Sequence, residues 1–333
     1  MDRVSLPRRR CLNALGALAA AGTAFPALGQ PALDKVTVLT SWFAQAEHGG
    51  VFQAAAAGIY RNHGLEVTVR TGGPQINGIQ LLLAGEVDFS LNRDFAVLSG
   101  VERGFPLVTV AAPMQWDSTG ILAHEHVQGL ADLKDKTILI AGTAHLYWWP
   151  WLKAKYGYTD AQSRPYTSNL QPFFADRNIV QQAVASAEPY QAGEKGVKAK
   201  FFPFAREGYP PYHGAITTVG KNVTERADMV QRLVRATLEG WKSFLADPAP
   251  AAEAIKKANP NMTDGEIAYG LRYFRDSKVL TGGDAAQLGI GAMTDERWRK
   301  TRDFMVEYGL LKPATDWKKA YTLRFVRDLR IMA

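Results

Sequence analysis

The feature that most constrains the fold is an alternation of short apolar runs with amphipathic stretches along this 333-residue chain. This alternation is typical of a parallel or mixed β-sheet flanked by helices. We expect strands near residues 36–40, 65–70, 87–91 and 107–113 and, in a second series, near 136–141, 181–187 and 198–204. Helices are expected at 50–62, at 75–84 and from 142 to about 156. The two series have a similar order of elements, so the sequence predicts an α/β fold with two lobes.

Only helical patterns follow residue 224. Apolar residues recur at helical spacing over residues 226–245, 251–258, 263–275 and 284–308. Two helix-start signals support this reading: Asp247 precedes Pro248, and Thr263 stands three residues before Glu266 as in a capping box. No low-complexity linker separates this region from the rest, so we expect these helices to pack on the first lobe.

Two irregular segments are expected to carry the chain between the lobes. They lie at residues 113–120 and 208–214, and the second reads GYPPYHG. Two such crossings form a hinge. We therefore expect one lobe to comprise residues 30–116 plus 217–333, and the other residues 117–216. A ligand would lie between them, at the carboxyl ends of the strands.

Residues 1–29 have the composition of an export signal peptide. Arginines 8–10 precede an apolar run of mostly small residues at 14–25. Paired arginines resemble a twin-arginine signal, but Cys11 and Asn13 depart from its pattern, so that route and the general secretory route both stay open. No later segment approaches about 18 uninterrupted apolar residues. We expect a soluble, monomeric periplasmic protein that begins near Gln30.

Cysteine count and charge exclude several classes of site. Cys11 is the single cysteine, so the secreted chain would hold no disulfide, thiolate metal site or cysteine nucleophile. The formal net charge of +7 falls to +4 without the first 29 residues, and no long basic run remains, so no nucleic-acid partner is expected. His124, Glu125 and His126 suggest metal ligands, but neighbours on a strand point to opposite faces. We expect no metal and no cofactor.

Aromatic and polar side chains follow nearly every expected strand. At strand ends they would face the cleft between the lobes. We expect ligand contacts from Trp42, His48, Asn92, Gln115, Trp116, Thr143, His145, Tyr147, Trp148, Glu188, Tyr190 and Tyr212. Alternatives stay open for some of them: Glu188 before a proline also suits a helix start, and His48 before two glycines also suits a helix cap. Arg93 and Asp94 are expected to form a structural or solvated ion pair.

Several short motifs, in this order and spacing, resemble a known family. They lie at residues 42–48, 58–60, 64–67, 82–89, 130–136 and 188–190. The chain resembles the nitrate, alkanesulfonate and thiamine-pyrimidine group of periplasmic solute-binding proteins over its whole length after the signal. The resemblance implies a type II periplasmic-binding-protein fold. It also implies delivery of a captured solute to an inner-membrane ABC permease and its ATPase.

The residue types narrow the choice of solute. A small oxyanion requires hydrogen-bond donors and positive potential, whereas Glu188 would repel it in a desolvated cleft. The same carboxylate suits ring N–H or amine donors, and side chains such as Trp42 and Trp148 would sandwich a flat ring. We therefore expect a flat nitrogen heterocycle, with a thiamine pyrimidine precursor as first choice and a flavin as second. An alkanesulfonate or nitrate is the alternative.

Two other functional classes stay open beside import. A eukaryotic pyrimidine synthase of the same fold depends on a histidine and a cysteine-rich iron site, and His48 would be its histidine. The lack of cysteine after the signal argues against such an enzyme, and no hydrolase, Walker or zinc-protease motif appears. We expect a binding protein with no catalytic residue. A ligand-sensing partner of a signalling receptor would use the same cleft.

Overall fold

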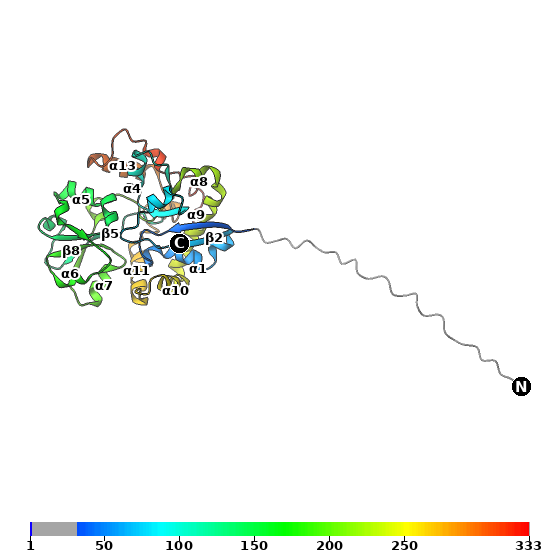
Figure 1. The fold of residues 1–333 in the computed structure, drawn as a ribbon, viewed down its shortest axis with the longest axis horizontal. Coiled ribbons are helices and arrows are strands. Elements are labelled where there is room, and N and C mark those ends of the chain that lie inside the picture. The colour runs from blue at the N-terminus through cyan, green and yellow to red at the C-terminus, as the bar shows by residue number, and fades with distance from the viewer. Residues whose placement is uncertain (2–31, 333) are drawn as a thin grey trace. The chain divides into compact units, whose positions relative to one another are not determined.

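The computed structural model of the chain describes residue 1 and residues 32–332 (Figure 1). The expected signal peptide, Cys11 and the cleavage site near Gln30 lie outside the described residues. Within the described part, no helix combines the length and apolar character that crossing a bilayer requires.

The first sheet has five strands in the order β2-β1-β3-β10-β4. Their bounds are β1 (Asp34–Leu39), β2 (Leu65–Arg70), β3 (Phe89–Asn92), β4 (Leu107–Ala111) and β10 (Ala215–Val219). β1 pairs in parallel with β2 and β3, and β10 runs antiparallel to β3 and β4. Short helices connect the strands: η1 (Ala46–His48), α1 (Gly49–Ala56), α2 (Ile59–Asn62), α3 (Gly78–Leu83) and α4 (Asp94–Glu102).

The second sheet repeats this arrangement in the order β7-β6-β8-β5-β9. Its strands are β5 (Thr119–His124), β6 (Thr137–Ile140), β7 (Ser163–Pro165), β8 (Ile179–Val184) and β9 (Ala199–Pro203). β6 is parallel to β7 and β8, and β5 is antiparallel to β8 and β9. The 3-10 helices of this region are η2 (Leu130–Leu133), η3 (Gly142–Leu146), η4 (Asp160–Gln162) and η5 (Phe204–Glu207), and its α-helices are α5 (Trp149–Tyr156), α6 (Gln171–Ala175) and α7 (Glu188–Glu194). The α/β fold with two similar series is confirmed; β5, β7 and β10 are additions to the expected strands.

The chain crosses between the sheets twice, as expected. It leaves the first sheet after β4 and returns to it through β10, and the two connections pair with each other. The Met114 N–H donates to the His213 carbonyl at 3.3 Å, and the His213 N–H donates to the Met114 carbonyl at 3.1 Å. The two-crossing arrangement is thus confirmed, while the lobe boundaries at residues 117 and 216 stay a prediction.

The helices after β10 pack mainly on the first lobe. They are α8 (Gly220–Glu225), α9 (Ala227–Ala246), α10 (Ala249–Ala258), α11 (Asp264–Ser277), α12 (Ala285–Leu288), α13 (Asp295–Glu307) and η6 (Trp317–Ala320). In Figure 1, α9 and α10 lie beside α1, in agreement with their contacts. The single helix expected over residues 284–308 is wrong, because Gly289 and Gly291 (φ +93° and +89°) break it into α12 and α13.

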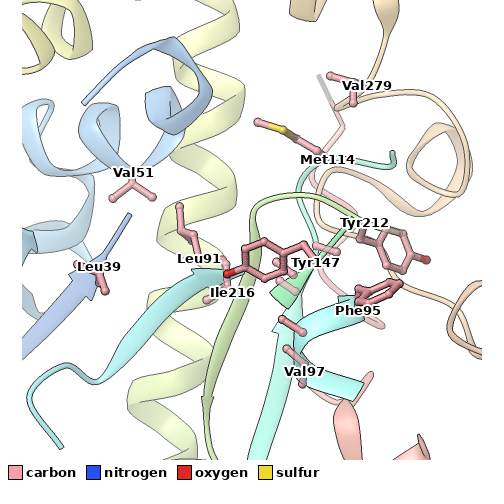
Figure 2. Packing of buried hydrophobic residues seen from close by; sticks show 14 of the residues in the cluster. Leu39, Val51, Leu91, Phe95, Val97, Met114, Tyr147, Tyr212, Ile216 and Val279 are labelled. Atoms are coloured by element: carbon pink, nitrogen blue, oxygen red, sulfur yellow. The ribbon is translucent and has the colours of Figure 1, made fainter. Parts of the chain in front are cut away.

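Close packing of α1 on α9 positions the segment that leads into the cleft. A Cβ at Gly50 would lie 2.3 Å from the Trp241 ring, and one at Gly49 2.5 Å from Phe244, so only glycines allow this approach. One buried cluster runs from the first sheet through the connections to the second lobe. Figure 2 shows Leu91, Met114 and Tyr147 among its members. The two lobes therefore share a continuous core in this conformation.

Candidate functional site

A narrow cleft lies between the two lobes, where strands of both sheets end. We call it the inner cleft. It is lined by five of the residues expected as ligand contacts, namely Trp42, Thr143, Tyr147, Trp148 and Glu188. Thr143 and Tyr147 follow β6, Trp42 follows β1, and Glu188 follows β8, so the strand-end argument accounts for their position.

Seven expected contact residues do not line the inner cleft: His48, Asn92, Gln115, Trp116, His145, Tyr190 and Tyr212. Two of them hold the connections between the lobes. The Gln115 amide donates to the carbonyls of Ala112 at 3.2 Å and Ala292 at 3.0 Å. The Tyr212 ring is fully buried, and its hydroxyl donates to Asp284 at 3.2 Å. The polar groups of Gln115 and Tyr212 thus already form hydrogen bonds within the protein.

The others have varied environments. The Asn92 amide is buried and donates to the Ser90 carbonyl at 3.2 Å. Trp116 is half-buried near Gly282, and Tyr190 packs its ring against Tyr269 at a centroid distance of 5.4 Å. His145 lines a separate hollow beside α3 and α4. His48 is buried directly behind the inner cleft, next to a carboxylate that does line it.

That carboxylate is Glu47, which sequence reasoning missed. It lies on η1 directly after β1, and its Oε1 is 3.1 Å from His48 Nε2, which also contacts Ser41 Oγ at 3.1 Å. Burial raises the pKa of Glu47, but the adjacent His48, with His213 and Arg93, outweighs burial and lowers the pKa to about 2. Glu47 Oε2 is buried without a hydrogen-bond partner among the described residues. The inner cleft therefore contains an ionised acceptor with one free oxygen.

Arg93 also lines the inner cleft, and its partner is not the expected one. The ion pair with Asp94 is wrong: Arg93 Nε donates to Asp117 Oδ2 at 2.5 Å, while Asp94 accepts from the Thr301 hydroxyl at 2.9 Å. Arg93 Nη2 donates to Thr119 Oγ1 at 2.8 Å, and the guanidinium lies 5.1 Å from the centre of the Tyr147 ring. The positive charge of Arg93 is thus matched by Asp117 within the wall.

His213 completes this buried group from the second connection. Arg93 Nη2 donates to His213 Nε2 at 3.0 Å, and His213 Nδ1 lies 3.5 Å from Asp117 Oδ1. Burial, with the nearby Arg93, lowers the pKa of His213 to about 4, so its imidazole is neutral near pH 7. Burial raises the pKa of Asp117, but Arg93 and His213 outweigh it and hold that pKa below its usual range. The hinge side of the cleft is therefore an ion pair held by a neutral histidine.

Glu188 lines the opposite wall and begins α7, so both interpretations of this residue describe part of its role. Its Oε1 accepts from the Tyr166 hydroxyl at 2.9 Å, and its Oε2 accepts from the Val184 N–H at 2.8 Å. Burial raises the pKa of Glu188 to about 7. Both oxygens already have protein donors, so direct acceptance from a ligand stays a prediction for this side chain.

Tyr166 brings an aromatic ring across the cleft from the second lobe. It follows β7, and its ring stacks on Trp42 of the first lobe at a centroid distance of 6.1 Å and an interplanar angle of 11°. Sequence reasoning missed Tyr166 because β7 is only three residues long and leaves no apolar run. Glu47 had a detectable signal, since it stands within the same strand-end motif as Trp42 and His48.

Two five-stranded mixed sheets, two crossings and a cleft at the strand ends define the type II periplasmic-binding-protein fold. A solved structure of the alkanesulfonate-binding protein SsuA from Xanthomonas axonopodis pv. citri, bound to MOPS, has this fold. It is similar over 88% of this chain and 99% of its own, with a TM-score of 0.63 and 16% identity. The chain belongs to the NMT1/THI5 like family, whose model matches residues 45–251. The resemblance noted from the motifs is thereby confirmed.

Two curated relatives differ in how much of the chain they match. The riboflavin-binding protein RibY of Chloroflexus aurantiacus is 26% identical over 320 residues, which is 92% of this chain and 91% of RibY. The 4-amino-5-hydroxymethyl-2-methylpyrimidine phosphate synthase THI11 of Saccharomyces cerevisiae is 29% identical over 89 residues, 27% of this chain and 26% of the synthase. Similarity thus covers 92% of the chain for a protein named as a binding protein and about a quarter of the chain for one named as an enzyme.

Proposed function

We propose that this protein is the periplasmic solute-binding component of an ABC importer and captures a flat nitrogen heterocycle in the inner cleft. The lobes that close on the solute are residues 30–116 plus 217–333 and residues 117–216. The proposal is carried by Glu47, a buried and ionised carboxylate whose Oε2 lacks a partner among the described residues. A buried acceptor of this kind requires a donor, and the solute is the donor that the cleft admits.

The aromatic side chains that line the cleft with Glu47 favour a particular kind of hydrogen-bond donor, one carried by a flat ring. Trp42, Tyr147 and Trp148 line the same cleft and offer flat apolar surfaces. An amine or ring N–H on a flat heterocycle would form a charge-assisted hydrogen bond to Glu47 while its faces contact these rings. A thiamine pyrimidine precursor has an exocyclic amine of this type and is the first candidate.

A flavin is the second candidate, because the relative that matches 92% of this chain is named as a riboflavin-binding protein. An alkanesulfonate or nitrate is disfavoured on charge. Such an anion would face the ionised Glu47, while Arg93, the one arginine among the described residues that line the cleft, already pairs with Asp117. A synthase activity draws support from similarity over 27–31% of this chain, and we propose no catalytic residue.

Mass spectrometry of solutes released by denaturing the protein from its native host tests this proposal. We expect a flat nitrogen heterocycle, which should rebind in calorimetry with a Kd of about 1 μM or tighter, equivalent to roughly 8 kcal/mol. Loss of uptake of that solute on deletion of the gene would support import over sensing. A released sulfonate or nitrate that rebinds, with no heterocycle, would overturn the proposed ligand.

A further inference from the structure

We infer that the solute carries a neutral, hydroxylated arm without a phosphate, and that this arm lies in a second hollow next to the inner cleft. The inference rests on the proposed function and adds the chemical class of the solute. The inference is based on the position and lining of a hollow that an unsubstituted pyrimidine bound in the inner cleft would not occupy.

The second hollow, which we call the outer chamber, has a volume of about 280 Å³. It shares Trp42, Gln45 and Glu188 with the inner cleft, so the two spaces adjoin along these side chains. The second lobe adds Tyr166, and α11 adds Glu266. A molecule whose ring occupies the inner cleft can therefore extend a substituent past Trp42 into the outer chamber.

Amide and hydroxyl groups dominate the polar lining of the outer chamber. They belong to Gln45, Thr167, Ser168, Gln191, Asn259 and Asn261. Gln45 lines both hollows and is only 8% exposed. Alcohol groups both donate and accept, so a hydroxylated arm can satisfy amides and hydroxyls together. Gln45 marks the point where such an arm would leave the ring.

The described lining of the outer chamber offers no cation to a phosphorylated arm. Glu188 and Glu266 line it, and none of its described lining residues is lysine, arginine or histidine. Glu266 is buried and accepts from the Gln191 amide at 2.6 Å. A phosphate dianion placed here would lose its hydration and gain no cation from the described lining residues. The geometry therefore selects the dephosphorylated form of a hydroxylated heterocycle.

Calorimetry with three flavins that share one ring tests the inference on the secreted form of the protein. Lumiflavin has no arm, riboflavin has a hydroxylated arm, and riboflavin 5′-phosphate adds a phosphate to that arm. We expect riboflavin to bind about 10-fold or more tightly than lumiflavin and riboflavin 5′-phosphate, because only riboflavin satisfies the outer chamber without burying charge. The aminopyrimidine 4-amino-5-hydroxymethyl-2-methylpyrimidine is titrated alongside.

A charge introduced at the chamber provides a second test. Thr167 is exposed and lines the outer chamber, so Thr167→Lys adds a cation without disturbing the core. We expect the affinity ratio of riboflavin 5′-phosphate to riboflavin to rise about 10-fold in Thr167→Lys and not in the neutral, similarly long Thr167→Gln. An unchanged ratio in both variants would contradict the placement of the arm.

The outcomes separate this inference from the function on which it rests. Equal affinity for lumiflavin and riboflavin, or riboflavin 5′-phosphate bound as tightly as riboflavin, overturns the inference and leaves heterocycle capture intact. Binding of the aminopyrimidine alone also overturns it, because the single hydroxymethyl group of that solute is too short to extend from the inner cleft into the outer chamber. Binding of none of the four heterocycles contradicts the proposed function itself.

Discussion

The two walls of the inner cleft each present a buried glutamate, and the two carboxyl groups differ in pKa and in hydrogen bonding. Glu47 on the first lobe has a pKa near 2 and one oxygen without a partner among the described residues. Glu188 on the second lobe has a pKa near 7, and both its oxygens accept hydrogen bonds from the protein. The first wall is therefore arranged to recognise a donor, whereas the second is held in place by its own hydrogen bonds.

Neighbouring charges, and not the depth of burial, account for this difference. Both carboxyls are buried, at 5% and 6% exposure. Glu47 lies beside His48 and within the field of Arg93, and these groups outweigh desolvation. Glu188 has the Tyr166 hydroxyl as its side-chain partner, and the carboxylate of Glu47 raises its pKa further. Similar burial thus gives a recognition group on one wall and a structural group on the other.

The largest expected effect comes from removing the cation of the first wall. Arg93→Met leaves Asp117 buried and unpaired, so the free energy of unfolding should fall by about 3–5 kcal/mol. Arg70 is the matched control, because its contact with Glu86 is an exposed 3.9 Å pair and Arg70→Met should cost less than about 1 kcal/mol. Urea unfolding measures both. Similar losses in the two variants would remove the distinction between a buried wall charge and a surface charge.

Glu188 should make stability depend on pH in the opposite sense to an ordinary ion-paired carboxylate. Its folded pKa of about 7 exceeds the unfolded value of 4.5, so between these values the folded protein retains a proton that the unfolded chain lacks. Stability should therefore fall as pH rises from about 4.5 to 7, by up to roughly 3 kcal/mol. Glu188→Gln should lose this slope, while its amide oxygen can still accept from the Val184 N–H and its NH2 can donate to a reoriented Tyr166 hydroxyl.

The comparison is made on the difference between two unfolding curves measured from pH 4.5 to 8. Asp94, whose pKa burial also raises to about 7, contributes equally to both proteins and cancels. Parallel curves for the wild type and Glu188→Gln would show that Glu188 is ionised throughout and that the two walls do not differ.

Binding should respond to Glu47 more than to Glu188. Glu47→Gln replaces the free carboxylate oxygen by an amide, so affinity for an amino heterocycle should fall by about 1.5–3 kcal/mol, roughly 10- to 150-fold. Glu188→Gln, measured at pH 7 by the same calorimetry, should change the Kd by less than about 3-fold. If Glu188→Gln weakened binding more than Glu47→Gln, the second wall and not the first would recognise the solute.

Sequence patterns were sufficient to predict the fold and about half of the expected cleft residues. Hydrophobic periodicity detects strands that lie between amphipathic helices, such as β1 and β6. It missed β5 and β10, which enter each sheet directly from a connection and run antiparallel to their neighbours. The prediction of a continuous helix at 284–308 is wrong. Apolar residues keep a helical spacing through Gly289 and Gly291, but both glycines have positive φ angles that end a helix.

The missed site residues have a different cause. A strand end predicts that a segment faces the cleft, but the turn that follows decides which of its side chains points inward. η1 directs Glu47 into the inner cleft and leaves His48 behind it, and no spacing distinguishes these neighbours. Gln115 and Tyr212 have suitable chemistry, but they form hydrogen bonds to partners within residues 284–294, far along the chain.

The smallest expected effect separates ring recognition from charge recognition. Trp42 lines both hollows and stacks on Tyr166, so Trp42→Leu should weaken binding about 3- to 10-fold through lost ring contact. This loss should be the same for a heterocycle and its desamino analogue, because stacking does not involve the amine. The Glu47→Gln loss should disappear with the desamino analogue. Trp116→Leu is the matched control, since Trp116 lies outside both hollows and should leave the Kd unchanged. If Trp116→Leu weakened binding as much as Trp42→Leu, the solute would lie nearer the hinge than the two walls place it.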